Sequence, residues 1–389
     1  MSSPLRVGIL GLGPAGVAHG RGYLHAGGYR IDSVCDLIGT RIESFRREVT
    51  ECRVAESLDT LLKDPGIDVV SVCLPTDLHA PVAVKALRAG KHVVLEVPLA
   101  DTLKGARALL RAADRAASQP PAASKAPPVL LPAYVRLFGG PEMASQQAVG
   151  KGYIGEPRLV RATWFRPLGV PQGARARTDA NGWYVDRNRS GGGALIDLGG
   201  PLLALGWSLL GRPVPLAVFA HGGSPLTGLP VEEHASLLIR FEGGAALELS
   251  VAWAAHLPPR QYGVACRVSG DAGCIDVYAP EGAVLYRGQP GQAKATVLKG
   301  PKLTHHAAMM RHLKTLIGAE HAARMRPLRQ AVTVAAMLDA AYRSLATGRS
   351  ADVREPGRDG PEPAAATSAR SESAQSDSAQ SDSARSDFA

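Results

Sequence analysis

The sequence predicts an α/β protein with two folded domains. The N-terminal half should form a doubly wound parallel sheet, and the C-terminal half an α+β domain with a large open, mostly antiparallel sheet. The first expectation rests on short apolar runs that alternate with helical segments, which is the pattern of βαβ units. These runs lack polar alternation, as strands buried on both faces do. The second rests on pairs of strand-like segments that flank glycine-rich turns and indicate hairpins.

Strands and helices are expected in alternation along the N-terminal half. The strands are Arg6–Leu10, Ile31–Cys35, Val69–Leu74 and Val93–Leu95. The helices run from the glycines after Leu10 to about Ala26, over Thr40–Glu48, over Asp77–Ala89, and from Asp101 to about Ala117. Thr76 or Asp77 would cap the third helix, Gly90 follows its end, and Asp101 would cap the fourth.

A proline-rich loop separates the two halves. Residues 118–128 hold four prolines and little apolar surface, so the predicted domains are 1–130 and 131–350. The second domain should contain a strand over Leu159–Phe165 and two hairpins. Their arms are Ser236–Phe241 with Ala245–Trp253, and Val264–Ser269 with Cys274–Tyr278. Helices are expected at about His305–Ile317 and Leu328–Ala346.

Beyond about Pro356 the composition changes. Three copies of a five-residue unit, SAQSD, SAQSD and SARSD, occupy residues 373–387. A segment so poor in apolar side chains cannot bury enough surface to offset the entropy lost on ordering. Residues 356–389 are therefore predicted to be a disordered, low-complexity tail.

Composition and charge exclude several classes of protein. The formal net charge is +9, but the basic residues are scattered and aromatic residues make up only 5%. No helix-turn-helix, zinc finger or RNP motif is present, so nucleic acid is not an expected partner. No run reaches 18 apolar residues and no signal peptide is recognisable, so we expect no membrane span and a cytoplasmic protein.

Neither the cysteines nor the histidines predict a metal site. The cysteines form no C-x-x-C pair and are expected as free thiols. They are Cys35, Cys52, Cys73, Cys266 and Cys274. His305, His306 and His312 share one expected helix, but no carboxylate or cysteine accompanies them there. A solvated or lining face is therefore preferred over a metal cluster.

A dinucleotide-binding signature opens the chain. Residues 11–16, GLGPAG, form G-x-G-x-x-G directly after a strand, and Asp36 ends the second strand. Gly11 permits the tight turn, Gly13 lets the backbone approach a pyrophosphate, and Gly16 lets helix and strand pack closely. The helix N-terminus offers N–H groups to the phosphates. Asp36 would bind the adenosine ribose and repel a 2′-phosphate, which favours NAD over NADP, while Arg41 softens that preference.

Several segments together resemble the Gfo/Idh/MocA family, the glucose–fructose oxidoreductase and inositol dehydrogenase group. They are residues 11–16, 34–37, 74–100 (LPTDLHAPVAVKALRAGKHVVLEVPLA), 155–164, 191–199 (GGGALIDLG) and 338–349. The resemblance implies an N-terminal Rossmann domain and a C-terminal domain through whose open sheet members often form homo-oligomers. It also implies oxidation or reduction of a sugar, polyol or similar small carbinol or carbonyl compound.

The resemblance extends the expected cofactor site and exposes three departures. The expected cofactor-binding residues are Gly11, Gly13, Pro14, Ala15, Gly16, Asp36, Arg41, Pro75, Thr76, His79, Glu96 and Pro98. The Glu-Lys-Pro motif of the family falls on residues 96–98, where Val97 replaces the lysine. The family histidine near the end of the glycine-rich stretch is Pro201, and an acidic residue common three positions later is Ala204. Valine and proline cannot transfer the hydroxyl proton of a carbinol.

Four other side chains are candidates for that proton path. Asp197 matches the family aspartate of the glycine-rich stretch and could act as a base if burial raises its pKa. Tyr184 and His79 are the other expected catalytic residues, with Tyr134 as a further candidate. The alternatives are a structural hydrogen bond from backbone N–H groups for Asp197, a capping or packing role for His79, and packing roles for both tyrosines.

Two hypotheses of different classes follow. The first is an NAD-dependent oxidoreductase with altered proton-transfer residues and a small-molecule substrate. The alternative is a non-catalytic NAD-binding sensor or scaffold that kept the fold and the cofactor site. A nucleic-acid binder ranks last, because the positive charge can serve to attract an anionic dinucleotide.

Overall fold

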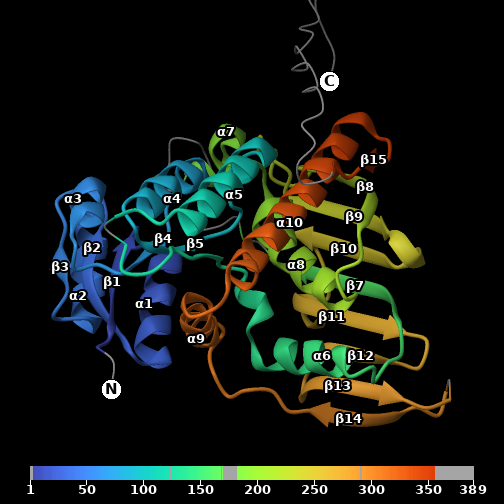
Figure 1. Cartoon of the computed structure of the whole chain (residues 1–389). Helices are drawn as coiled ribbons and strands as arrows, with labels where there is room; N and C mark the ends of the chain where they lie inside the picture. Colours follow the sequence, from blue (N-terminus) through green and yellow to red (C-terminus); the bar gives the residue numbers. More distant parts are fainter. Residues whose placement is uncertain (1–2, 123, 168, 170–181, 290, 355–389) are drawn as a thin grey trace, which may run out of the picture. The chain divides into compact units, whose positions relative to one another are not determined.

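The first sheet of the computed structural model is parallel throughout (Figure 1). The structure describes residues 3–122, 124–167, 169, 182–289 and 291–354, so the predicted tail lies outside the described residues. The strands are β1 (Leu5–Leu10), β2 (Tyr29–Cys35), β3 (Arg53–Val54), β4 (Val69–Val72), β5 (His92–Leu95) and β6 (Leu130–Pro132). They are ordered β3-β2-β1-β4-β5-β6. This is the doubly wound order, whose switch point lies between β1 and β4.

Helices connect these strands and are amphipathic or small-residue rich. They are α1 (Pro14–Ala26), α2 (Gly39–Glu48), α3 (Leu58–Lys63), α4 (His79–Arg88) and α5 (Leu103–Ser118). The strand residues between them are buried on both faces, with Val69, Val70 and Val72 fully inaccessible. This confirms the parallel sheet predicted from uninterrupted apolar runs.

The second sheet is large, open and mostly antiparallel. Its strands are β7 (Pro157–Phe165), β8 (Pro215–Gly223), β9 (His234–Phe241), β10 (Ala246–Ala252), β11 (Gly263–Gly270), β12 (Gly273–Ala279), β13 (Gly282–Arg287), β14 (Lys294–Leu298) and β15 (Ala351–Asp352). Their order is β14-β13-β12-β11-β7-β10-β9-β8-β15, and among the pairings only β7 with β10 is parallel. Both predicted hairpins are present, joining β9 to β10 and β11 to β12.

Five further helices are present in the second half of the described chain. They are α6 (Gly140–Gly150), α7 (Arg187–Ser190), α8 (Gly200–Leu209), α9 (His305–Ile317) and α10 (His321–Thr347). Helix α8 is apolar all round and lies in the core, packed against β7 and α10. The opposite face of the sheet exposes Phe219 and Leu238, which are 49% and 47% accessible. Homo-oligomer formation through this sheet stays a prediction.

Two segments, β6 and α9, pack with the first sheet although they were expected wholly or partly in the second domain. Strand β6 lies across the predicted boundary between residues 130 and 131, and it pairs with β5 in the first sheet. Helix α9 packs against α1 (Figure 1), and its Met309, Met310 and Leu313 join the core beneath β1. The exact boundary between domains 1–130 and 131–350 therefore stays a prediction.

Three helix ends differ from the sequence-based expectation. Thr102, rather than Asp101, caps α5, because the Thr102 hydroxyl accepts a hydrogen bond from the Gly105 N–H at 3.2 Å. The helix expected from Asp77 is a 3₁₀ turn over Thr76–Leu78 followed by α4, without a side-chain cap. Helix α10 begins at His321, before the expected start at about Leu328, and contains Pro327.

One helical stretch, Arg187–Leu209, has the length and hydropathy of a membrane span, but 83% of its most apolar window is buried inside the fold. All five cysteines are free, as predicted. The net positive charge of the sequence lies within residues 1–350, since residues 351–389 contain 4 arginines and 8 acidic residues.

Candidate functional site

The glycine-rich turn after β1 has room for a phosphate group. Gly11 has φ +85°, and a Cβ there would lie 2.2 Å from the Cys73 carbonyl oxygen. A Cβ at Gly16 would lie 1.9 Å from the Gly11 carbonyl oxygen, so Gly16 allows close packing of α1 on the turn. A Cβ at Gly13, the N-cap of α1, would meet nothing within 4 Å. Packing does not require this glycine, and open space beside a helix N-terminus fits a pyrophosphate.

Asp36 lies at the end of β2 and holds the glycine-rich turn. Its Oδ2 accepts a hydrogen bond from the Leu12 N–H at 2.6 Å, and its Oδ1 accepts one from the Ile38 N–H at 2.8 Å. The Arg41 guanidinium lies 4.0 Å from Asp36 Oδ2. This places both predicted specificity residues beside the turn, where an adenosine ribose binds in folds of this type.

The loop after β4 forms the next part of the site. Thr76 is 3% accessible and His79 is 2% accessible. The His79 ring lies between two carbonyl oxygens, with Nδ1 2.7 Å from Pro98 O and Nε2 2.8 Å from Leu74 O. Burial lowers the pKa of His79, and the two carbonyl groups oppose that change. The ring ties the loop after β4 to the loop after β5, so neither nitrogen is free to reach a substrate.

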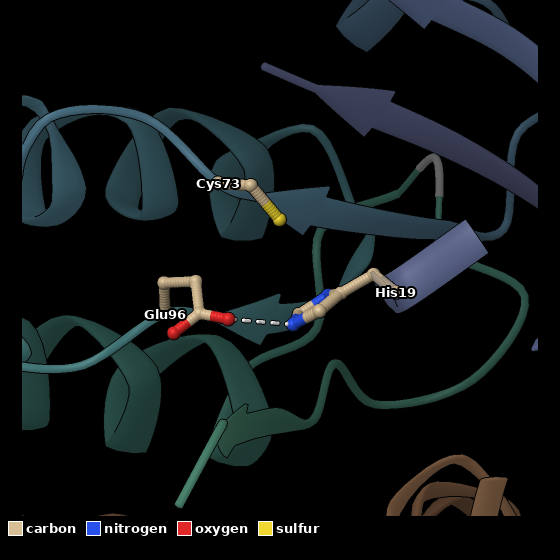
Figure 2. A group of neighbouring side chains, drawn as sticks. All are labelled: His19, Cys73 and Glu96. Atoms are coloured by element: carbon tan, nitrogen blue, oxygen red, sulfur yellow. Dashed lines mark hydrogen bonds and ion pairs between the residues drawn. The ribbon is translucent and has the colours of Figure 1, made fainter. Parts of the chain in front are cut away.

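Beneath these loops, Figure 2 shows three side chains that converge from separate elements. His19 comes from α1, Cys73 directly follows β4, and Glu96 directly follows β5. His19 Nε2 lies 2.9 Å from Glu96 Oε1, and Nδ1 lies 3.0 Å from Ser71 Oγ. The Tyr23 hydroxyl completes the chain of contacts at 2.8 Å from Ser71 Oγ.

In this cluster the fully buried His19 ring contacts Glu96, whose side chain is 21% accessible. Burial disfavours a charged ring, but Cys73 and Glu96 outweigh it and raise the pKa of His19. Burial is the largest single influence on Glu96 and opposes its charge, but the hydrogen bond with His19 and the nearby histidines together outweigh burial and lower the pKa of Glu96. Burial raises the pKa of the Cys73 thiol.

The same three residues are the group among the described residues that could hold a metal ion, with ligand atoms within 4.8 Å of one another. Both His19 nitrogens already have hydrogen-bond partners, Ser71 Oγ and Glu96 Oε1, so a metal ion bound by the ring would have to displace one of them. The expectation that the chain binds no metal stays a prediction.

Apolar side chains occupy the positions where the family pattern is polar. Val97 packs against the core beside Glu96, and its peptide bond to Pro98 is cis. Pro201 lies in the first turn of α8, and Ala204, on the same helix, is 4% accessible. Tyr134 is buried in an apolar environment that raises its pKa, consistent with the packing alternative.

The remaining tyrosine candidate lies on the second half of the chain. The Tyr184 ring stacks on Trp183 with 3.8 Å between centroids. Trp183 and Tyr184 both belong to a 3₁₀ turn over Gly182–Val185. The stacked geometry fits the packing alternative, and a catalytic role for Tyr184 stays untested.

Asp197 is the candidate base that the structure leaves within reach of a ligand. It lies in a single π-helical turn, Leu195–Gly199, with its side chain 26% accessible. Its Oδ2 accepts a hydrogen bond from Trp253 Nε1–H at 2.8 Å and lies 3.5 Å from Arg166 Nη1. Burial raises the pKa of Asp197, Arg166 and Trp253 oppose the rise, and nearby Glu96 adds to it. The carboxylate is held by side chains, in contrast to the backbone contacts considered in the sequence analysis.

The backbone N–H groups of the glycine run bind a different carboxylate. Glu232 Oε1 accepts hydrogen bonds from Gly193 N–H at 2.8 Å, Leu195 N–H at 3.1 Å and the Tyr342 hydroxyl at 2.8 Å. A Cβ at Gly193 would lie 2.0 Å from the Glu232 carbonyl oxygen, so glycine is required for this approach. Since Asp197 N–H bonds to Gly193 O, Glu232 fixes the turn that carries Asp197.

We expect Glu232→Ala to lower the free energy of unfolding by about 3 kcal/mol, because each buried donor left unpaired costs about 1–3 kcal/mol. Glu232→Gln keeps an acceptor oxygen and should cost less than half as much. Chemical denaturation of both variants checks this. Equal decreases in the free energy of unfolding for Glu232→Ala and Glu232→Gln would contradict the role of the acceptor oxygen. No decrease in either variant would show that these hydrogen bonds do not stabilise the turn.

Sequence reasoning missed several of these residues. Glu232 could have been noticed as one of two adjacent acids, Glu232 and Glu233, that are both buried in an apolar stretch. His19 follows Gly16 by three residues on the inner side of α1. The three histidines of α9 face different partners: His305 lies 2.9 Å from Glu142, His306 lies beside His19, and His312 beside Phe138. The lining interpretation is therefore preferred over a metal cluster.

These features define a dinucleotide-binding α/β protein with a second, sheet-based domain. Residues 5–119 match the family described as "Oxidoreductase family, NAD-binding Rossmann fold", and residues 143–276 match the "GFO/IDH/MocA C-terminal domain". The chain therefore belongs to the Gfo/Idh/MocA family, as its motifs predicted.

Curated relatives match parts of the chain. D-glucoside 3-dehydrogenase of Escherichia coli is 31% identical over 57% of this chain and 58% of its own length. A dTDP-3,4-didehydro-2,6-dideoxy-alpha-D-glucose 3-reductase of Streptomyces violaceoruber is 34% identical over 47% of this chain and 51% of its own length. The chain thus spans about half the length of these two relatives.

Solved structures confirm the fold over most of the chain. An NAD-binding oxidoreductase from Klebsiella pneumoniae is 22% identical with a TM-score of 0.72, covering 91% of this chain and 100% of that chain. An oxidoreductase domain protein from Kribbella flavida is 20% identical with a TM-score of 0.74 over the same shares of both chains. Both comparisons support the two-sheet architecture.

Proposed function

We propose that the protein is an NAD-dependent oxidoreductase that oxidises a carbinol of a sugar, polyol or similar small molecule. The observation that carries the proposal is the open space at Gly13 together with the half-buried Asp197 carboxylate near Glu96. The two relatives described above are named as a sugar dehydrogenase and a sugar reductase, which supports the proposal. Asp36 at the expected ribose position favours NAD, because its carboxylate would repel a 2′-phosphate.

The residues that would hold the cofactor fall in two groups. The turn over Gly11–Gly16 and Asp36 would hold the pyrophosphate and the adenosine ribose, and Pro75, Thr76, Glu96 and Pro98 would line the nicotinamide end. When bound, oxidised NAD supplies the acceptor for a hydride. The His19–Glu96 ion pair fixes the orientation of the loop after β5 from below.

Asp197 is the proposed general base. It accepts the proton of the substrate hydroxyl as the carbinol C–H bond breaks with its electron pair, the C–O bond becomes a carbonyl, and the proton passes from the carboxyl group to solvent. Trp253 and Arg166 hold the carboxylate in place through its Oδ2, which leaves Oδ1 for the substrate hydroxyl. A carboxyl group with a raised pKa is a stronger base than an ordinary aspartate.

A non-catalytic NAD-binding sensor or scaffold is the second candidate, favoured by the apolar Val97, Pro201 and Ala204. One assay separates the two. The protein is mixed with NAD and a panel of sugars, polyols and sugar acids, and the absorbance at the reduced nicotinamide band is followed. We expect turnover with at least one compound. A thermal shift from NAD without turnover of any compound would favour the sensor, and NAD at a hundred times its Kd should add about 2.7 kcal/mol of stability.

A further inference from the structure

Two arginine side chains converge on one tryptophan beside Asp197. The Arg136 guanidinium carbon lies 4.6 Å from the Trp164 ring centroid, and that of Arg166 lies 5.6 Å from it. Arg136 belongs to a 3₁₀ turn, Val135–Leu137, that follows β6 of the first sheet. Arg166 directly follows β7 of the second sheet. Two cations from different halves of the chain thus meet at the same indole.

Strand alternation places this group on the inner face of the second sheet. Val160 and Ala162 of β7 are buried, and Trp164 shares their face because successive residues of a strand point to opposite sides. Arg166 reaches this side as well, since its Nη1 lies 3.5 Å from Asp197 Oδ2. The arginines therefore adjoin the carboxylate proposed to take the substrate proton.

Each arginine has one carboxylate partner in the described chain, at a longer distance than a direct hydrogen bond. Arg136 lies 3.9 Å from Glu142 Oε1, which already receives hydrogen bonds from Tyr278 and His305. Arg166 lies 3.5 Å from Asp197, and its Nη1 donates to the Gly169 carbonyl at 3.3 Å. By contrast, Arg161 on the outer face forms a 2.6 Å hydrogen bond with Glu248.

Both guanidinium groups also remain partly open to a ligand. The side chains of Arg136 and Arg166 are 23% and 33% accessible. A guanidinium group binds carboxylate or phosphate oxygens through two parallel N–H donors. The indole of Trp164 offers an apolar surface on which the C–H face of a sugar ring can pack.

Resting on the proposed function, we propose that the substrate is a sugar derivative that carries an oxyanion, either a carboxylate or a phosphate. Arg136 and Arg166 bind the oxyanion, and Trp164 supports the ring. Asp197 then faces a hydroxyl of the same sugar. Arg136 and Arg166 are substrate-binding residues in this scheme and take no part in proton transfer.

The test is calorimetric titration of the NAD-loaded protein with D-glucuronate, D-gluconate, D-glucose 6-phosphate and D-glucose. We expect at least one anionic compound to bind about tenfold or more tightly than glucose, as hydrogen bonds to charged groups contribute about 1.5–3 kcal/mol. The carboxylate and phosphate compounds separate a sugar acid from a sugar phosphate. Glucose that binds as tightly as every anionic compound would overturn the inference.

Substitutions of the two arginines test where the anionic compound binds. Arg136→Gln and Arg166→Gln should each weaken binding of the preferred anion about tenfold or more, with partial recovery in the lysine variants. Arg161→Gln is the matched control, because it removes an arginine from the outer face, and it should bind the anion as the wild type does. Unchanged anion affinity in both inner-face variants would contradict the assignment. If one variant fails to fold, the other variant and the comparison of anionic compounds with glucose on the wild type still test the proposal.

Failure of the inference and failure of the proposed function give different results. Anion binding without formation of reduced NAD from any compound would remove the proposed oxidation and leave the anion site standing. Oxidation of neutral sugars, with no preference for anions in binding, would remove the anion site and leave the oxidoreductase standing.

Discussion

Replacement of Asp197 by asparagine is expected to lower kcat/KM for oxidation by roughly 10²–10⁴-fold, or about 2.7–5.5 kcal/mol, the usual contribution of a positioned acid or base. Asparagine has nearly the same shape and can still accept the Trp253 N–H at its amide oxygen. It cannot accept the hydroxyl proton of the substrate. Steady-state absorbance assays of the wild type and Asp197→Asn measure the loss directly.

The pH dependence of the wild type adds a second readout. A general base must be ionised, so kcat/KM for oxidation should fall as the pH drops through the pKa of Asp197. Burial raises the pKa of Asp197 above its ordinary value of 3.8, so the midpoint of this acid limb should lie above 3.8. The limb should be absent from any residual activity of Asp197→Asn.

Two controls accompany this prediction. Affinity for NAD should be unchanged in Asp197→Asn, because the glycine-rich turn is untouched. Tyr184→Phe should keep most of the activity if its ring only packs on Trp183. A variant Asp197→Asn that oxidises substrate at the wild-type rate would show that another group takes the proton.

The second large effect is expected at Gly13. Gly13→Ala should raise the Kd for NAD at least about tenfold, which is about 1.4 kcal/mol, because the added methyl group enters the space assigned to the pyrophosphate. Gly13 has φ −67°, so alanine needs no strained backbone there. Alanine gains about 0.4–1 kcal/mol from a more restricted unfolded chain and loses a similar amount as an N-cap, so stability should change little. Fluorescence titration with NAD and thermal unfolding measure the two effects separately.

Gly16→Ala is the matched control for this prediction. Its added methyl group would lie 1.9 Å from the Gly11 carbonyl oxygen, so the fold itself must shift. We expect a loss of about 1–3 kcal/mol in stability, typical of overpacking. If Gly13→Ala bound NAD as tightly as the wild type, the turn would not be the pyrophosphate site.

The parallel sheet and the glycine-rich turn could be predicted from sequence because their causes are local. A buried strand followed by G-x-G-x-x-G determines the turn geometry within a few residues, and the structure gives Gly11, Gly13 and Gly16 the three different environments expected of them. The hairpin of β9 and β10 was predictable for the same reason, because Gly243 and Gly244 supply the positive φ angles of the turn.

The surroundings of Asp197 could not be predicted in this way. Its partners Trp253 and Arg166 and the clamp formed by Glu232 and Tyr342 come from segments that are distant in sequence. Only the packing of α8 and α10 on the second sheet brings them together. A single glutamate or arginine carries no local pattern, so its role emerges only from the tertiary structure.

The packing partners of β6 and α9 could not be predicted for a related reason. β6 is short, and the proline-rich loop before it favoured a domain boundary, but hydrogen bonds to β5 place it in the first sheet. Helix α9 has an apolar face whichever domain it packs against. Its sequence does not indicate that the partner of this face is α1. Element type was predictable in both cases, and the partner element was not.

A crystal structure of the protein with NAD tests the central claim most directly. The account predicts phosphates at Gly13, a ribose at Asp36 and the nicotinamide ring on the side of the site that holds Asp197. A carbinol placed between them should have its hydroxyl about 3 Å from the Asp197 carboxylate and its carbon about 3–3.5 Å from the hydride-accepting carbon. A nicotinamide ring that faces only apolar side chains, with Asp197 too distant for a substrate to contact both, would contradict the account.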